Sequence, residues 1–184
     1  STTVAIPSEV YTNCTTMVRY MVENDFKLPS LKSMQGKMWK VGYEQGTLYG
    51  HVYEDFVPML QWMKSQNVHV YIYSSGSVQA QKLLFGHSTH GNVLQYIDGH
   101  FDITTSGNKK NATSYTNICT SLKIEPSQLI FCSDSEAELQ AATQAGIGSA
   151  IMTIRPGNAP LSEDAKTTYP HVVSLLQLCG GSGN

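Results

Sequence analysis

Hydroxyl and carboxylate side chains follow two apolar segments of the chain, and both sets could bind ions. Ser74, Ser75, Gly76 and Ser77 come directly after an apolar segment at residues 68–73. A turn of this kind presents hydroxyls and backbone N–H groups, which favour an anion such as phosphate. Taken alone, the same residues also fit an ordinary connection between a strand and a helix.

The second candidate is Asp134, which comes directly after the apolar segment 129–133. Its carboxylate could hold a divalent metal ion, because hard cations prefer oxygen ligands. It could equally cap the helix that is predicted to follow, since aspartate is common at helix N-caps. Glu136 and Glu138 lie in the first turn of that helix, where the helix dipole favours negative charge.

The hydrophobic pattern around these residues alternates between strand and helix. Segments 68–73 and 129–133 are mostly apolar, as buried strands are, and each precedes a helical pattern. This alternation predicts an α/β fold with a parallel sheet. Ligands of such sheets bind outside the carboxyl ends of the strands, where both candidate sets lie. Further strands are predicted at 97–102 and 147–154, and helices at 13–26, 29–39, 53–65, 78–85, 114–122, 135–145 and 169–178.

Composition limits the function classes. The 184 residues predict one domain, or one domain with a partial second one. Charged residues make up only 14% and the net charge is −2 without a basic block, so neither nucleic acid nor an anionic membrane is an expected partner. We expect no membrane span and no signal peptide. The four cysteines have no CxxC spacing, which favours reduced thiols and a cytoplasmic location.

Five longer segments resemble the haloacid dehalogenase superfamily and, within it, the enolase-phosphatases, which are also called acireductone synthases. These segments are residues 31–39, 71–78, 81–86, 96–102 and 155–159, within a resemblance that covers residues 4–178. The resemblance implies a haloacid-dehalogenase-like, Rossmannoid parallel sheet with a partial helical cap. Residues 1–50 would be the remnant of the cap, residues 51–178 the α/β core, and residues 179–184 a flexible tail.

The resemblance also implies a reaction and a set of site residues. The family enolises a phosphorylated diketone of methionine salvage and then removes its phosphate, using one magnesium ion. Ser74 and Ser75 match the substrate-binding serines of the family, Lys109 matches its phosphate-binding lysine, and Asp134 matches its magnesium-binding carboxylate. A lysine suits this task because it is a mobile point charge that can stabilise a transferring phosphoryl group.

Two neighbours of these residues have open interpretations. Lys110 is an alternative to Lys109, and both could also be solvated residues of a loop. Glu138 lies one helical turn after Asp134 and could orient the magnesium site indirectly. It could equally be a solvated charge on the helix surface.

The resemblance has one large departure. The nucleophile of the superfamily is the first aspartate of an Asp-x-Asp or Asp-x-Glu motif, and this motif lies at the end of the first strand. This sequence has no such motif in that place. In the family, that strand lies between the segments matching 68–73 and 129–133. We therefore expect this central position to be filled by residues 2–6 or by a partner chain. Without the nucleophile, the chain alone is predicted to be inactive and to bind magnesium weakly or not at all.

Two functions remain open from the sequence. In the first, the chain derives from a magnesium-dependent acireductone synthase and keeps subsites for a phosphorylated small molecule and a metal. In the second, it is a truncated, non-catalytic homologue, a pseudoenzyme that serves as a structural or accessory subunit of a larger complex. The retained Ser74, Ser75, Lys109 and Asp134 favour the first function, and the missing acid pair favours the second.

Overall fold

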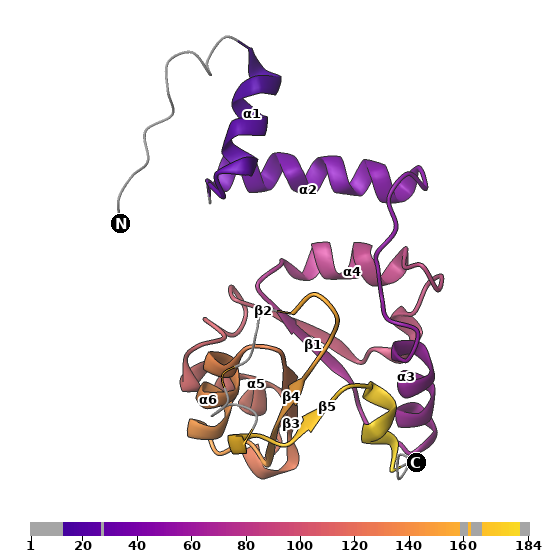
Figure 1. The fold of residues 1–184 in the computed structure, drawn as a ribbon, viewed down its shortest axis with the longest axis vertical. Coiled ribbons are helices and arrows are strands. Elements are labelled where there is room, and N and C mark those ends of the chain that lie inside the picture. The colour runs from indigo at the N-terminus through magenta and orange to yellow at the C-terminus, as the bar shows by residue number, and fades with distance from the viewer. Residues whose placement is uncertain (1–12, 27, 159–161, 163–166, 181–184) are drawn as a thin grey trace. The chain divides into compact units, whose positions relative to one another are not determined.

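The computed structural model describes residues 13–26, 28–158, 162 and 167–180, which form parts of two compact units. The first unit is Ser1–Leu48 and the second is Tyr49–Asn184 (Figure 1). The candidate site lies entirely in the second unit. That the first unit is the remnant of a cap stays a prediction.

The first unit contains two helices, α1 (Cys14–Glu23) and α2 (Pro29–Glu44). The Asn13 side chain caps α1 by accepting a hydrogen bond from the Thr16 backbone N–H at 2.8 Å. Pro29 stands at the start of α2, where its missing N–H costs nothing. The two helices predicted from the sequence here are confirmed, although α1 ends three residues early and α2 continues beyond residue 39.

The second unit holds two parallel sheets. Strand β1 (Tyr71–Ser74) pairs with β2 (Gly99–Asp102), so that Ser74 lies opposite Asp102. Strand β3 (Ile130–Ser133) pairs with β4 (Ser149–Thr153), which pairs in turn with β5 (His171–Val172). The predicted α/β class with parallel strands is confirmed.

No strand bridges the two sheets within the described part of the chain. There, β1 is bonded only to β2, and β3 only to β4. Residues 2–6, one of the two expected sources of a central strand, lie outside the described residues. The filled central position therefore stays a prediction.

Helices cover both sides of the strands in the second unit. In Figure 1, α5 (Ala112–Leu122) and α6 (Glu136–Gln144) lie on one side of β3 and β4, and α3 (Phe56–Ser65) lies on the other. Helix α4 (Val78–Gly86) follows β1, and short 3-10 turns occupy Leu94–Tyr96, Pro126–Gln128 and Leu175–Cys179. One apolar cluster is built around Tyr115, Leu139 and Met152, and a second around Met59, Leu60 and Val93.

The C-terminal segment corrects the sequence prediction. The helix predicted at 169–178 is wrong in its first part, where residues His171–Val172 form β5, whereas Leu175–Cys179 is helical as a 3-10 helix. Two backbone hydrogen bonds recruit the first part to β4: Met152 N–H donates to the Pro170 carbonyl at 2.8 Å and Ile154 N–H to the Val172 carbonyl at 2.9 Å. Cys179, which was assigned to the tail, ends that 3-10 helix and packs against the second apolar cluster.

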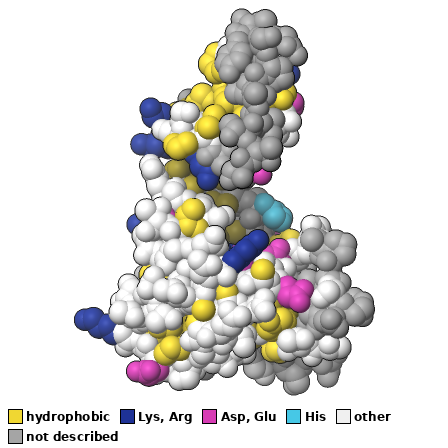
Figure 2. All heavy atoms as spheres, turned by 90° about the vertical axis from the view of Figure 1, so that its left-hand side faces the viewer, with side chains coloured by type: hydrophobic (Ala, Val, Ile, Leu, Met, Phe, Trp, Pro, Cys, Tyr) yellow, Lys and Arg dark blue, Asp and Glu magenta, His cyan; other side chains and the backbone are white. Residues whose placement is uncertain are grey.

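The surface agrees with the low charge of the sequence. On the face drawn in Figure 2, the Lys, Arg, Asp and Glu side chains of the described residues are scattered and form no patch of a single sign. Within the described ranges, no helix is long and apolar enough to cross a membrane.

Candidate functional site

The serine turn joins β1 to α4. The Ser74 hydroxyl accepts a hydrogen bond from Gly76 N–H at 3.2 Å, and the Ser77 hydroxyl caps α4 by accepting from Ala80 N–H at 3.2 Å. The Ser75 side chain is exposed. Ser74 and Ser77 therefore shape the turn, while Ser75 presents its hydroxyl to solvent beyond the end of β1.

Two buried side chains, those of Gln81 and Asp102, hold this turn through hydrogen bonds. The Gln81 amide donates to the carbonyls of Gly76 and Phe101, both at 2.9 Å. Asp102 Oδ2 accepts from Val78 N–H, the first residue of α4, at 2.9 Å. Because both contacts join the turn to β2, the position of the serines depends on a strand that follows them by about 25 residues.

Asp102 is a structural carboxylate. Its Oδ1 accepts from Thr104 N–H at 2.9 Å and from Thr105 N–H at 2.8 Å, so both oxygens are occupied. Burial alone would raise the pKa of Asp102, but the hydrogen bonds from Val78, Thr105 and Thr104 outweigh it and hold the pKa below its usual value. Asp102 stays ionised and stabilises the turn through its hydrogen bond with Val78, a role that was not predicted from the sequence.

Lys109 lies between the two sheets. Its Nζ is 5.7 Å from the centre of the Tyr73 ring on β1 and 6.0 Å from the centre of the Phe131 ring on β3. It also forms an ion pair with Glu138 on α6, with an Nζ–Oε2 distance of 2.6 Å. The Lys109 side chain is only 19% exposed, whereas Lys110 is exposed. Lys110 is therefore a solvated loop residue, whereas Lys109 is not.

Glu138 connects Lys109 to the end of β3. Its Oε2 also accepts a hydrogen bond from the Ser133 hydroxyl at 2.7 Å. The buried Tyr115 hydroxyl bonds to the carbonyls of Lys109 at 2.7 Å and Glu138 at 3.1 Å. Burial, and secondarily the Glu138 charge, raises the pKa of Tyr115, so this hydroxyl stays protonated. Glu138 is thus a half-buried counterion and not a solvated surface charge.

Asp134 lies at the carboxyl end of β3 and is exposed. The N-cap of α6 is Ser135, without a side-chain cap, so the interpretation of Asp134 as the cap is wrong. One oxygen of Asp134, Oδ2, accepts from the Asn158 amide at 2.8 Å. Among the described residues, no group of three or more His, Cys, Asp or Glu side chains could form a metal cage. Magnesium keeps several waters and often takes only one or two protein carboxylates, so Asp134 fits as one ligand.

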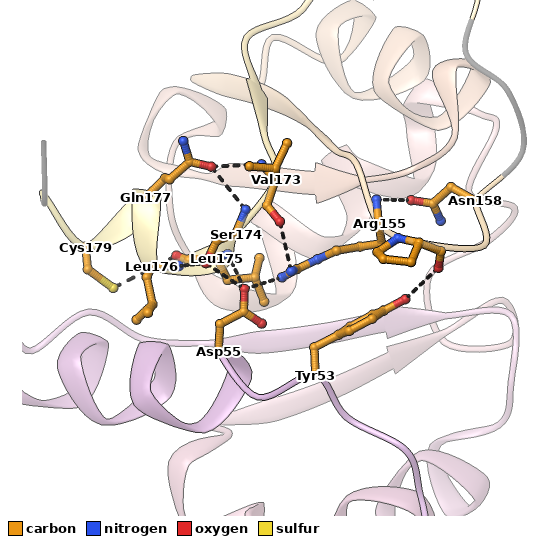
Figure 3. A network of polar contacts seen from close by, with 11 residues as sticks. Tyr53, Asp55, Arg155, Asn158, Val173, Ser174, Leu175, Leu176, Gln177 and Cys179 are labelled. Atoms are coloured by element: carbon orange, nitrogen blue, oxygen red, sulfur yellow. Dashed lines mark hydrogen bonds and ion pairs between the residues drawn. The ribbon is translucent and has the colours of Figure 1, made fainter. Parts of the chain in front are cut away.

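An ion pair anchors the loop that carries Asn158 (Figure 3). Arg155 Nη2 donates to Asp55 Oδ2 at 2.7 Å, and the same oxygen accepts from the Ser174 hydroxyl and Leu175 N–H, both at 2.8 Å. The Arg155 guanidinium lies 4.7 Å from the centre of the Tyr53 ring. Burial alone would raise the pKa of Asp55, but these hydrogen bonds, led by that from Arg155, hold it below its usual value.

The sequence missed this network because its two halves are 100 positions apart. The only signal was the segment 155–159, which matched the enolase-phosphatase pattern without a role for any of its residues. Asp55 itself makes structural contacts, since its carboxylate accepts from Arg155, Ser174 and Leu175.

A cavity of about 280 Å³ adjoins the network. Its walls include Cys132 from β3, Phe56 from α3 and Phe85 from α4, together with Arg155. Asp55 Oδ1 is buried without a hydrogen-bond partner among the described residues. Burial raises the pKa of Cys132 to about 11, so its thiol is protonated near neutral pH.

The chain is similar in sequence to known hydrolases. Residues 23–146 match the haloacid dehalogenase-like hydrolases. The chain is 44% identical to enolase-phosphatase E1 of Drosophila ananassae over 88% of this chain and 64% of that protein. It is 41% identical to enolase-phosphatase E1 of Caenorhabditis elegans over 92% of this chain and 68% of that protein.

Solved structures agree with these matches. The UTR4 protein of Saccharomyces cerevisiae superposes with a TM-score of 0.77 at 37% identity, over 88% of this chain and 72% of that one. CbbY from Rhodobacter sphaeroides in complex with phosphate superposes with a TM-score of 0.65 at 16% identity, over 85% and 68% of the two chains, and so shares the fold.

The chain spans a little under two thirds of some of its relatives, for example 64% of the Drosophila ananassae protein and 63% of that of Naegleria gruberi. The match to the family nevertheless extends over most of this chain and includes the strand ends that carry Ser74 and Asp134. The chain belongs to the haloacid dehalogenase-like hydrolases, and within them to the enolase-phosphatases.

Proposed function

We propose that this chain carries the phosphate and metal subsites of an acireductone synthase of methionine salvage, whose substrate is a phosphorylated diketone. The observation that supports the proposal most is the position of Lys109. Its ammonium group lies between the ring of Tyr73 on β1 and the ring of Phe131 on β3, beside the strand ends where ligands of parallel sheets bind. The relatives named enolase-phosphatase E1 favour this substrate class over other phosphate esters.

Each residue of the site has one task under this proposal. Ser74 and Ser75 bind the substrate, and Lys109 binds the phosphate. Asp134 contributes one oxygen ligand to magnesium, which would neutralise charge on the phosphate. Glu138 keeps Lys109 at the strand ends in the absence of substrate. An arriving phosphate competes with Glu138 for the ammonium group, which lowers the affinity of the site.

A binding experiment tests these assignments. Calorimetric titration of the chain with inorganic phosphate, with and without magnesium, should show weak binding that magnesium strengthens. Lys109→Ala should weaken phosphate binding roughly tenfold to a hundredfold, because one charge-assisted contact contributes ~1.5–3 kcal/mol. Lys110→Ala is the matched control, since that neighbour is exposed, and it should leave the affinity unchanged. Equal effects of the two substitutions would show that Lys109 does not bind phosphate.

We also propose that the chain alone does not turn over its substrate. The chemistry of the family needs a carboxylate nucleophile that attacks phosphorus, supplied by an Asp-x-Asp or Asp-x-Glu motif at the end of the first strand. In this sequence the one such triplet, Asp134-Ser135-Glu136, follows β3, and none follows an earlier strand. Phosphate release from the phosphorylated diketone by the purified chain should therefore stay at the background rate. Turnover at an ordinary enzymatic rate, about 1 s⁻¹ or more, would contradict this proposal.

The second candidate function is that of a non-catalytic subunit in a larger, cytoplasmic assembly. The observation that favours it is the pair of edges on β1 and β3 that have no strand partner among the described residues. Unpaired edges recruit strands from other chains. The two functions are compatible, because a partner that contributes a central strand could also contribute the missing acids.

A further inference from the structure

Asn158 uses both ends of its side-chain amide. Its Nδ2 donates to Asp134 Oδ2 at 2.8 Å, and its Oδ1 accepts from the Arg155 backbone N–H at 2.6 Å. The opposite orientation of the amide would place an NH₂ group against an N–H donor and an oxygen against a carboxylate. The two contacts together therefore fix the direction in which the amide points.

The backbone that carries Asn158 is itself held firmly. Asn158 N–H donates to the Arg155 carbonyl at 3.1 Å, which closes a tight turn. The Arg155 side chain is held by Asp55 and by the Val173 carbonyl, the latter at 3.0 Å. The Tyr53 hydroxyl donates to the Pro156 carbonyl at 3.2 Å (Figure 3). The amide thus extends from a supported turn toward a carboxylate that is exposed and has no other hydrogen bond among those found in the described residues.

We propose that Asn158 is a positioning residue for the carboxylate of Asp134, an inference that rests on the metal subsite of the proposed function. The amide engages Oδ2, which leaves Oδ1 as the oxygen directed to the metal. An exposed aspartate would otherwise rotate about two side-chain bonds, and ordering it would weaken metal binding. Partners of this kind around a metal ligand commonly contribute 10–100-fold to metal affinity.

The test is the affinity of the full chain for Mn²⁺ alone, used as a paramagnetic substitute for magnesium and followed by electron paramagnetic resonance. Asn158→Ala should weaken Mn²⁺ binding about tenfold while the melting temperature stays within a few degrees of the original. Asn92→Ala is the matched control, because Asn92 also accepts a backbone hydrogen bond, from Leu94, but lies outside the site. This control should not change the Mn²⁺ affinity.

The Asp134→Ala variant distinguishes a failure of the positioning role of Asn158 from a failure of the proposed metal subsite. If Asp134→Ala abolishes Mn²⁺ binding while Asn158→Ala leaves the affinity unchanged, Asp134 is a ligand that needs no positioning, and the inference is overturned while the proposed metal subsite stands. If Asp134→Ala has no effect, or the original chain binds no Mn²⁺ at millimolar concentration, the metal subsite itself is wrong and the inference falls with it.

Discussion

Two carboxylates, the partly buried Asp55 and the buried Asp102, stabilise the α/β unit without taking part in any proposed reaction. Each is surrounded by hydrogen-bond donors, with three bonded to Asp55 Oδ2 and three shared between the oxygens of Asp102. These donors stabilise the ionised form more than burial destabilises it, which is why both pKa values lie low. Ionised aspartates of this kind make the fold sensitive to acid.

Asp102→Asn should lower the free energy of unfolding at pH 7 by about 2 kcal/mol, because the amide turns an NH₂ group toward a backbone N–H donor. The folded pKa of Asp102 is below its ordinary value of 3.8, so its contribution is present above that value and is lost as the pH falls through the folded pKa. The variant should therefore lose less stability than the original chain between pH 6 and about pH 3. Urea denaturation across this range measures both effects.

Glu23→Gln provides the control, because Glu23 is an exposed carboxylate on α1. It should leave the pH dependence of unfolding close to that of the original chain. A variant at position 102 with unchanged acid sensitivity would show that other groups govern the acid response.

At the residue scale, the sequence predicted residues of the candidate site but not the residues that hold them in position. Ser74, Ser75 and Asp134 were recognisable because each directly follows an apolar segment, and strand ends are where parallel sheets bind ligands. Asp102 and Asn158 act through partners that only the fold brings near. The pairing of Arg155 with Asp55 spans 100 residues, a distance at which local patterns carry no information.

At the element scale, the connection from β1 to α4 is held by buried side chains. The turn depends on Gln81, whose side chain is buried at 5% exposure and whose amide also contacts His100 Nδ1 at 3.0 Å. Burial, and secondarily the charge of Lys82, lowers the pKa of His100, so the neutral ring faces Gln81. A single helical side chain thus ties the serine turn to β2.

Gln81→Leu should remove the side-chain donor from the carbonyls of Gly76 and Phe101 and destabilise the chain by about 2–3 kcal/mol. We also expect faster hydrogen exchange at residues 74–78, because the serine turn would open locally more often. Gln79→Leu is the control on the same helix, since that side chain is exposed. Local exchange rates that remain as slow as before in the Gln81 variant would show that the turn is held by other contacts.

Contacts between elements explain where the prediction of helices and strands succeeded and where it failed. Helices α4 and α5 and strands β1 and β3 follow from their own hydrophobic pattern, and their predicted positions are correct within a few residues. The first part of the predicted C-terminal helix fails because the edge of β4 takes Pro170 and Val172 as hydrogen-bond partners, and only Leu175–Cys179 is helical. A contact between distant segments outweighs a local preference there.

At the scale of the whole molecule, the question is what lies between β1 and β3. A partner strand is the favoured answer, and residues 2–6 are the alternative. Deletion of residues 1–7 distinguishes the two. With a partner strand, light scattering should show an assembly both before and after the deletion, whereas a strand from residues 2–6 would make the deleted chain unfold or aggregate. A deleted chain that stays folded, soluble and monomeric would contradict both answers.

The separate pairing of the two sheets also has a consequence for cooperativity. Side chains link the two sheets: Tyr73 of β1 packs against the first apolar cluster, where its ring meets Tyr115 edge to face at 5.8 Å. The segment after β5 packs in turn against the second cluster. Domains unfold as one unit only when their parts stabilise one another. Among the described residues, side chains and not hydrogen-bonded strands couple the β1–β2 half to the β3–β4–β5 half. A strand or a phosphorylated ligand bound between β1 and β3 should strengthen this coupling and make the unfolding of the two halves more cooperative.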